Sequence, residues 1–134
     1  MQILIVEDEP TITLVLAEAF QEQRFHVITA DNGFSGWEWL DKGFSPDAVL
    51  VDLIMPRMGG RALIEKIRAD PRFQHLPVVV ITGEVADAVA FPEPSTYQAL
   101  FTKPFDLDLL LAAVFQLVRQ RHSTGTGFLG LPPL

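Results

Sequence analysis

The sequence predicts a doubly wound α/β domain, in which helices cover both faces of one parallel sheet. Three observations lead to this prediction. Short apolar runs of strand length alternate five times with segments of helical periodicity. The apolar runs are continuous rather than alternating, which is typical of strands that are buried on both faces. A chain of 134 residues fits one domain of ordinary size, and no internal repeat or second domain is visible.

The five predicted strands are runs rich in β-branched and apolar residues. They lie at residues 2–6, 25–29, 47–51, 77–81 and 98–102.

Helical segments fill the intervals between these runs. The first follows Pro10, which suits a first helical turn, and its apolar residues recur at i, i+3, i+4, i+7 and i+8. A shorter helix is predicted over 34–40. A third is predicted between the glycine pair at 59–60 and Pro71.

The last two predicted helices differ in strength. Residues 84–90 favour a short helix, and a long loop must follow because Pro92 and Pro94 cannot continue it. The strongest helical pattern covers 107–118, with Asp106 as its N-cap.

We expect the domain to span residues 1–121. Residues 122–134 have no periodicity and contain several Gly and Pro, so they are expected to form a flexible C-terminal tail.

The composition excludes several classes of function. There is no Cys, which rules out disulfides, thiolate catalysis and Cys-type zinc sites. The net charge of −7 argues against direct binding to nucleic acid, which depends on clustered Lys and Arg. No apolar run approaches the roughly 18 to 20 residues of a membrane span, and the first residues lack the features of a signal peptide. We therefore expect a cytoplasmic protein that does not contact a membrane.

Polar residues follow four of the five predicted strands. Glu7 and Asp8 follow the first strand, Asp52 the third, Thr82 the fourth and Lys103 the fifth. Ligand sites in open α/β sheets gather at the carboxyl ends of the strands, so these side chains are expected to converge. Three carboxylates packed together repel one another unless positive charge lies nearby. Lys103 and a magnesium ion, which prefers such oxygen ligands, would supply that charge.

Four segments carry a resemblance to a known family. The stretches ILIVEDEP, VLVDLIMPRMGG, VVVITG and FTKPF occur in that order. Together they resemble the signature segments of the receiver domains of two-component response regulators, of the stand-alone chemotaxis-receiver type, over residues 1 to about 121. The resemblance implies a flavodoxin-like (βα)5 fold with strand order 2-1-3-4-5. It also implies a cis peptide bond between Lys103 and Pro104.

The resemblance further implies a metal site. Mg²⁺, for which Mn²⁺ can substitute, would be held by Asp8, Asp52 and the backbone carbonyl of Ile54. Glu7 would act through a bound water. No other cofactor is implied.

By the same resemblance, Asp52 is the phosphoacceptor, and the phosphoryl group comes from a sensor histidine kinase or a histidine phosphotransfer protein. Thr82 would contact the phosphoryl oxygens. Lys103 would pair first with the acidic cluster and then with the phosphate. The chemistry agrees, since a carboxylate can attack phosphorus bonded to a histidine nitrogen when metal and ammonium neutralise the phosphoryl oxygens. Such a protein is no enzyme beyond its own phosphorylation and dephosphorylation.

One position departs from the family pattern. Receivers commonly carry Tyr or Phe where this chain has Leu100, and by strand alternation Phe101 points to the other face. Thr82 and Leu100 are the expected switch residues, and coupling would pass through the helix at 84–90 and the loop at 91–98. The output partner, unidentified, is expected on the face formed by that helix, the fifth strand and the last helix.

Two other functions share some of these features. A pseudo-receiver, which docks partners without phosphorylation, would have the same fold, but the complete set of acidic residues, Thr82 and Lys103 argues against it. A phosphatase of the haloacid dehalogenase type also places an Asp after a strand. That class needs a second Asp two residues later, where this chain has Ile54.

Overall fold

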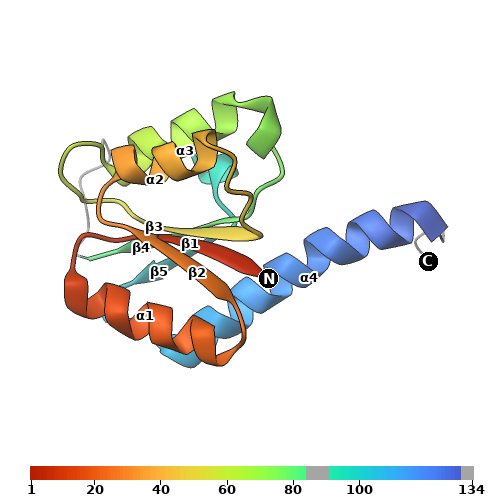
Figure 1. Ribbon diagram of the computed structural model, residues 1–134, viewed down its shortest axis with the longest axis horizontal. Coiled ribbons are helices and arrows are strands. Elements are labelled where there is room, and N and C mark those ends of the chain that lie inside the picture. The colour runs from red at the N-terminus through yellow and green to blue at the C-terminus, as the bar shows by residue number, and fades with distance from the viewer. Residues whose placement is uncertain (84–90, 131–134) are drawn as a thin grey trace.

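The predicted strands form one parallel sheet. Their bounds are β1 Gln2–Val6, β2 His26–Ala30, β3 Ala48–Asp52, β4 Val78–Thr82 and β5 Ala99–Thr102. In the computed structural model, which describes residues 1–83 and 91–130, the strand order is β2-β1-β3-β4-β5 (Figure 1). The expected fold class and strand order are confirmed.

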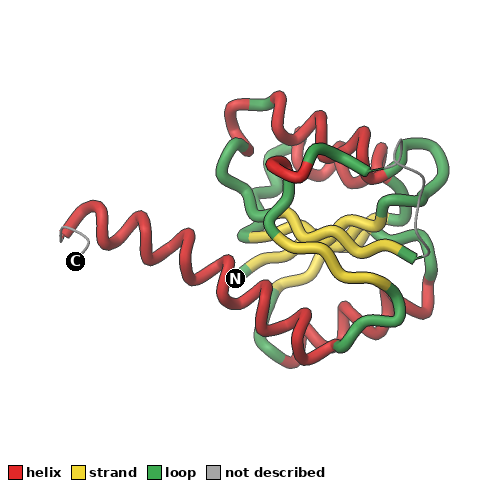
Figure 2. The backbone as a smooth tube through the Cα atoms, turned by 180° about the vertical axis from the view of Figure 1, so that it is seen from behind, coloured by secondary structure: helices red, strands yellow, loops and turns green. Residues whose placement is uncertain are grey.

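Helices cover both faces of the sheet. Their bounds are α1 Pro10–Glu22, α2 Gly33–Asp41, α3 Gly60–Ala69 and α4 Leu107–Gly130, with short 3-10 turns at η1 Pro71–Phe73 and η3 Pro94–Thr96. Figures 1 and 2 show α2 and α3 on one face and α1 and α4 on the other. The helix predicted over 84–90 lies outside the described residues, so α4 corresponds to the last predicted helix.

The helices begin where the sequence provides a local signal. Pro10 is the first residue of α1, as predicted. The side chain of Asn32 accepts a hydrogen bond of 2.9 Å from the Ser35 N–H and caps α2. Asp106 caps α4 as predicted, because its carboxylate accepts a hydrogen bond of 3.0 Å from the Leu109 N–H.

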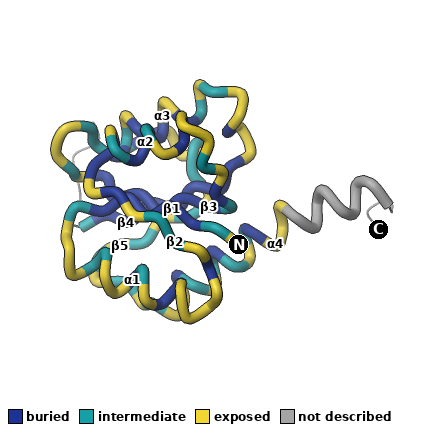
Figure 3. Tube along the Cα trace, in the orientation of Figure 1, coloured by how far each residue is buried: buried dark blue, intermediate teal, exposed yellow. Residues whose placement is uncertain are grey.

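Each face of the sheet has its own hydrophobic core. Figure 3 shows the central strands between the helices as buried. The core under α2 and α3 includes Val6, Val51, Leu63 and Val80. The core under α1 and α4 includes Ile5, Leu50, Ile81 and Leu110. Phe101 packs against this second core, so its neighbour Leu100 faces the other side, as strand alternation predicted.

Several boundaries differ from the prediction: β2, β3, β4, β5 and α2 each differ by one residue at one or both ends, and the last helix ends later than predicted. β2 begins at His26 instead of 25, because the buried Phe25 donates its N–H to the Phe20 carbonyl at 3.0 Å and so closes the C-terminal end of α1, which ends at Glu22. α4 continues to Gly130, whereas the sequence predicts a flexible tail over 122–134 (Figures 1 and 2). Glycine only weakens a helix, and no proline occurs in this stretch before 132. Within the described residues, none of the helices has the length and hydrophobicity required to cross a bilayer.

Candidate functional site

The carboxyl ends of four strands bring the predicted polar residues to one edge of the sheet. Asp52 and Thr82 are the last residues of β3 and β4, while Glu7 and Lys103 directly follow β1 and β5. Thr82 lies opposite Thr102 in the parallel register, so the ends of β4 and β5 are level. The side chains that face one another here come from distant parts of the sequence.

Glu7, Asp8 and Asp52 form a compact acidic cluster. Each offers a carboxylate oxygen, and these oxygens lie within 4.8 Å of one another. Glu7 is 2% exposed and Asp52 3% exposed, whereas Asp8 is half-buried. Burial is the main cause of the rise in the pKa of Glu7 to about 7, and the hydrogen bond with Asp52 is the second cause. Burial also raises the pKa of Asp52.

Lys103 supplies the positive charge that the acidic cluster requires. Its Nζ lies 2.9 Å from Glu7 Oε1, 3.1 Å from Glu9 Oε1 and 3.3 Å from Asp52 Oδ2. Burial lowers the pKa of this ammonium, but its contacts with Glu7 and Glu9 and the charge of Asp52 outweigh that effect and raise the pKa. The lysine is therefore charged at neutral pH, and it is shared among three carboxylates.

Glu9 is the member of this arrangement that sequence reasoning missed. The sequence pattern assigns roles to the first two acids of Glu7-Asp8-Glu9 and none to the third. The Glu9 backbone N–H donates to Glu7 Oε2 at 3.1 Å, and its side chain reaches Lys103 from the rim of the site. The only signal in the sequence was the presence of a third carboxylate directly after the first strand.

The backbone beyond β3 holds Asp52 in place. The Ile54 N–H donates to Asp52 Oδ1 at 3.3 Å, and the Gly60 N–H donates to the Leu53 carbonyl at 2.9 Å. Gly60 packs so closely on β3 that a Cβ atom at this position would collide with the Asp52 carbonyl. The glycine pair that predicted a helix start thus also allows α3 to approach the end of β3 closely.

Thr82 lies beside the cluster and is 1% exposed. Its Oγ1 has no hydrogen-bond partner in the described part of the chain, which is an unusual state for a buried hydroxyl. Its carbonyl accepts a hydrogen bond of 2.7 Å from the Lys103 N–H, which joins the ends of β4 and β5. The peptide bond between Lys103 and Pro104 is cis, as predicted.

Two predicted residues lie outside the cluster. The side chain of Leu100 is on β5, opposite Val80 in the register, and the residue is 41% exposed. Ile54 is 57% exposed, and it contacts Asp52 through its backbone N–H.

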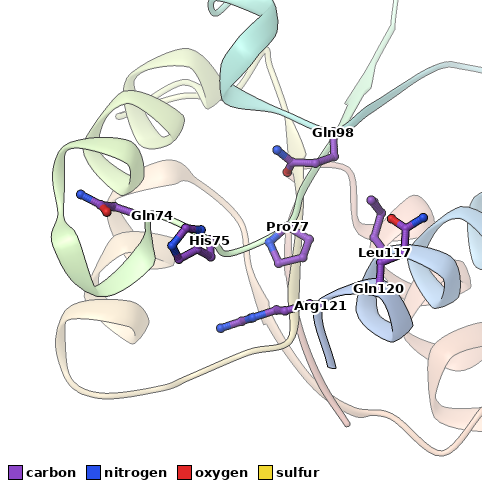
Figure 4. A pocket seen from close by; sticks show the side chains of 7 residues that line it. All are labelled: Gln74, His75, Pro77, Gln98, Leu117, Gln120 and Arg121. Carbon is purple, nitrogen blue, oxygen red and sulfur yellow. The ribbon is translucent and has the colours of Figure 1, made fainter. Parts of the chain in front are cut away.

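A hollow lies at the opposite edge of the sheet from the acidic cluster, where β4 and β5 begin. Its volume is about 620 Å³, and Pro77, Gln98, Leu117 and Arg121 are among its lining residues (Figure 4). None of the residues that line it is acidic, so it offers no carboxylate ligand for a metal. The candidate site is therefore the acidic edge.

Comparison with known proteins agrees with this geometry. The profile of the response regulator receiver domain family matches residues 3–115. The chain belongs to this family. Receiver domains take part in two-component signalling, interact with histidine kinases or phosphotransfer proteins, and bind Mg²⁺ in an acidic pocket like the one formed by Glu7, Asp8 and Asp52.

Individual relatives support the same assignment. The chain is 36% identical to response regulator Rre1 of Synechocystis sp. over 132 residues, which cover 95% of this receiver and 56% of that protein. It is 33% identical to chemotaxis protein CheY1 of Helicobacter pylori, over 63% of this chain and 68% of that one. It also matches 8% of hybrid signal transduction histidine kinase D of Dictyostelium discoideum, at 29% identity. The receiver thus spans about half or less of two of these relatives.

A solved structure shares the fold. The signal receiver domain of a signal transduction histidine kinase from Syntrophus aciditrophicus superimposes with a TM-score of 0.78 and is 27% identical. The match covers 89% of this chain and 90% of that one.

Proposed function

We propose that this receiver accepts a phosphoryl group onto Asp52 from a phosphohistidine and thereby changes its affinity for a partner. The observation that carries the proposal is the position of Asp52. Its carboxylate is almost fully buried, lies within the acidic cluster and is 3.3 Å from the Lys103 ammonium. A carboxylate in such surroundings is a candidate for chemistry, because keeping it there costs stability.

The residues present fit a magnesium ion. The cluster offers three carboxylates, and Mg²⁺ prefers hard oxygen ligands. Two buried oxygens, Glu7 Oε1 and Thr82 Oγ1, have no hydrogen-bond partner within the described residues, although Glu7 Oε1 is ion-paired with Lys103. Asp8, Asp52 and the Ile54 carbonyl would hold the ion, with Glu7 acting through water. When bound, magnesium would neutralise charge on the phosphoryl oxygens.

The protein's own residues would perform the transfer by positioning and charge. A carboxylate oxygen of Asp52 forms a bond to phosphorus, while the bond from phosphorus to the histidine nitrogen breaks and its electron pair leaves with the imidazole. Lys103 can then turn an N–H toward a phosphoryl oxygen. The unpartnered Thr82 hydroxyl can donate to another.

The partner that supplies phosphate is proposed to be a histidine kinase or a phosphotransfer protein. Two relatives are histidine kinases by name, the hybrid kinase of Dictyostelium discoideum and the sensor histidine kinase CheAY of Helicobacter pylori. The output partner is proposed to bind the face that includes β5 and α4. Leu100 is 41% exposed, and receivers commonly have an aromatic ring at this position, so we propose that this switch differs from the common one.

The experiment is incubation with acetyl phosphate and Mg²⁺, followed by intact mass measurement. We expect a gain of one phosphate in the wild type and in Asp31→Asn, which removes an exposed carboxylate that directly follows β2 at the same edge. Asp52→Asn should gain none. An equal gain in Asp52→Asn would refute the assignment, while no gain in the wild type would favour a pseudo-receiver that only docks partners.

A further inference from the structure

Three carboxylates contact the Lys103 ammonium, and one of them, Glu9, has no role in the proposed phosphorylation. Glu7 and Asp52 are buried, but the Glu9 side chain is 58% exposed and its Oε1 accepts a hydrogen bond of 3.1 Å from Nζ. An ammonium has three N–H donors, and three carboxylate oxygens lie within 3.3 Å of this one. The resting lysine therefore has no donor left for a phosphoryl oxygen.

The contact of Glu9 with Lys103 depends on a fixed backbone. Glu9 is the N-cap residue of α1 and directly precedes Pro10. Its N–H donates to Glu7 Oε2 at 3.1 Å, and its carbonyl accepts from the Thr13 N–H at 3.0 Å. Both sides of the residue are thus held, which keeps its side chain within reach of the ammonium.

Phosphorylation must release one of the three carboxylates from Lys103. Before the bond to phosphorus forms, releasing Glu7 or Asp52 would leave a buried carboxylate without its cation, which is costly. Releasing Glu9 costs little, because water can solvate an exposed carboxylate. Glu9 is therefore the partner that the incoming phosphoryl oxygen displaces.

We propose that Glu9 holds Lys103 in its resting position and thereby slows phosphoryl transfer onto Asp52. This inference rests on the proposed function. Glu9 is a positioning residue, since it acts through the ammonium and not on the phosphorus. Its contact stabilises the resting state and is lost as the phosphoryl group arrives, so it raises the barrier. Exposed ion pairs are weak, and we expect removal of the charge to accelerate the reaction by about two- to fivefold.

The test compares wild type, Glu9→Gln and Asp31→Asn. The control removes one negative charge from the same edge of the sheet at an exposed residue for which no contact with Lys103 is found among the described residues. Phosphorylation by acetyl phosphate with saturating Mg²⁺ is followed by intact mass at low and high salt. We expect Glu9→Gln to react faster than both other proteins, and the difference to shrink in high salt.

A second measurement needs neither metal nor phosphate. The ¹⁵N resonance of the Lys103 ammonium in the metal-free protein should shift in Glu9→Gln and stay unchanged in Asp31→Asn. The inference would be overturned if Glu9→Gln were phosphorylated no faster than the wild type, or if Asp31→Asn accelerated phosphorylation equally. It would also be overturned if the ammonium resonance of Lys103 were unchanged in Glu9→Gln. If the wild type takes up no phosphate, the proposed function fails. If the wild type is phosphorylated but one of the outcomes above is observed, only the inference about Glu9 fails.

Discussion

The raised pKa of Glu7 predicts that the metal-free receiver becomes less stable as the pH rises toward neutrality. Burial and the proximity of Asp52 raise this pKa from its ordinary value of 4.5 to about 7. Between these values the folded protein binds a proton that the unfolded chain has already released, so stability falls with pH. At about 1.4 kcal/mol per pKa unit, the loss between pH 5 and pH 8 is about 3 kcal/mol. Asp52 contributes with the same sign, and the two carboxylates titrate as a pair.

Urea unfolding at fixed pH values in the presence of EDTA measures this loss. We expect the wild type and Glu18→Gln, a control with an exposed carboxylate on α1, to lose free energy of unfolding from pH 5 to 8. Glu7→Gln should lose much less, because a neutral amide has no proton to release. Mg²⁺ should reduce the loss in the wild type by compensating the ionised carboxylates. A wild type whose stability is constant or rises over this range would refute the reasoning, as would an undiminished slope in Glu7→Gln.

Individual contacts lead to three further predictions. Asp8→Ala should weaken Mg²⁺ binding by about tenfold or more, because the ion loses a charged ligand, and tryptophan fluorescence during a titration would measure it; unchanged affinity would contradict the metal assignment. Gly60→Ala should lower the free energy of unfolding by about 1–3 kcal/mol, because the added Cβ collides with the end of β3. Gly83→Ala should have no such effect, since a Cβ at Gly83 would meet open space. Equal effects of the two substitutions would exclude a steric cause. Beryllofluoride should alter amide exchange more over 91–98 than over α3, and equal changes would show that the switch lies elsewhere.

The sequence was sufficient for the fold and for most of the candidate site because both depend on strands. Continuous apolar runs determine where the chain is buried on both faces, and parallel strands necessarily bring their carboxyl ends to one edge. Asp52, Thr82 and Lys103 could therefore be grouped from the sequence alone. The strand order, by contrast, came from the resemblance to receivers, since periodicity does not specify which strands are neighbours.

The parts that the sequence could not provide depend on side-chain contacts and on weak local preferences. The role of Glu9 depends on a rotamer that reaches Lys103, and a run of three acids does not reveal which of them points inward. The length of α4 depends on glycines that weaken a helix without ending it. The start of β2 depends on the hydrogen bond from the Phe25 N–H to the Phe20 carbonyl near the end of α1. Hydrophobicity alone does not indicate this bond.

The most direct test of the central claim is to locate the phosphate chemically. An aspartyl phosphate is an acyl phosphate, and borohydride reduces it to the alcohol, which converts the modified aspartate into homoserine. After treatment with acetyl phosphate and Mg²⁺, we predict homoserine at position 52 and at no other position when the reduced protein is digested and its peptides are sequenced by mass spectrometry. Homoserine at position 8, or a phosphorylated protein that yields none at position 52, would contradict the account.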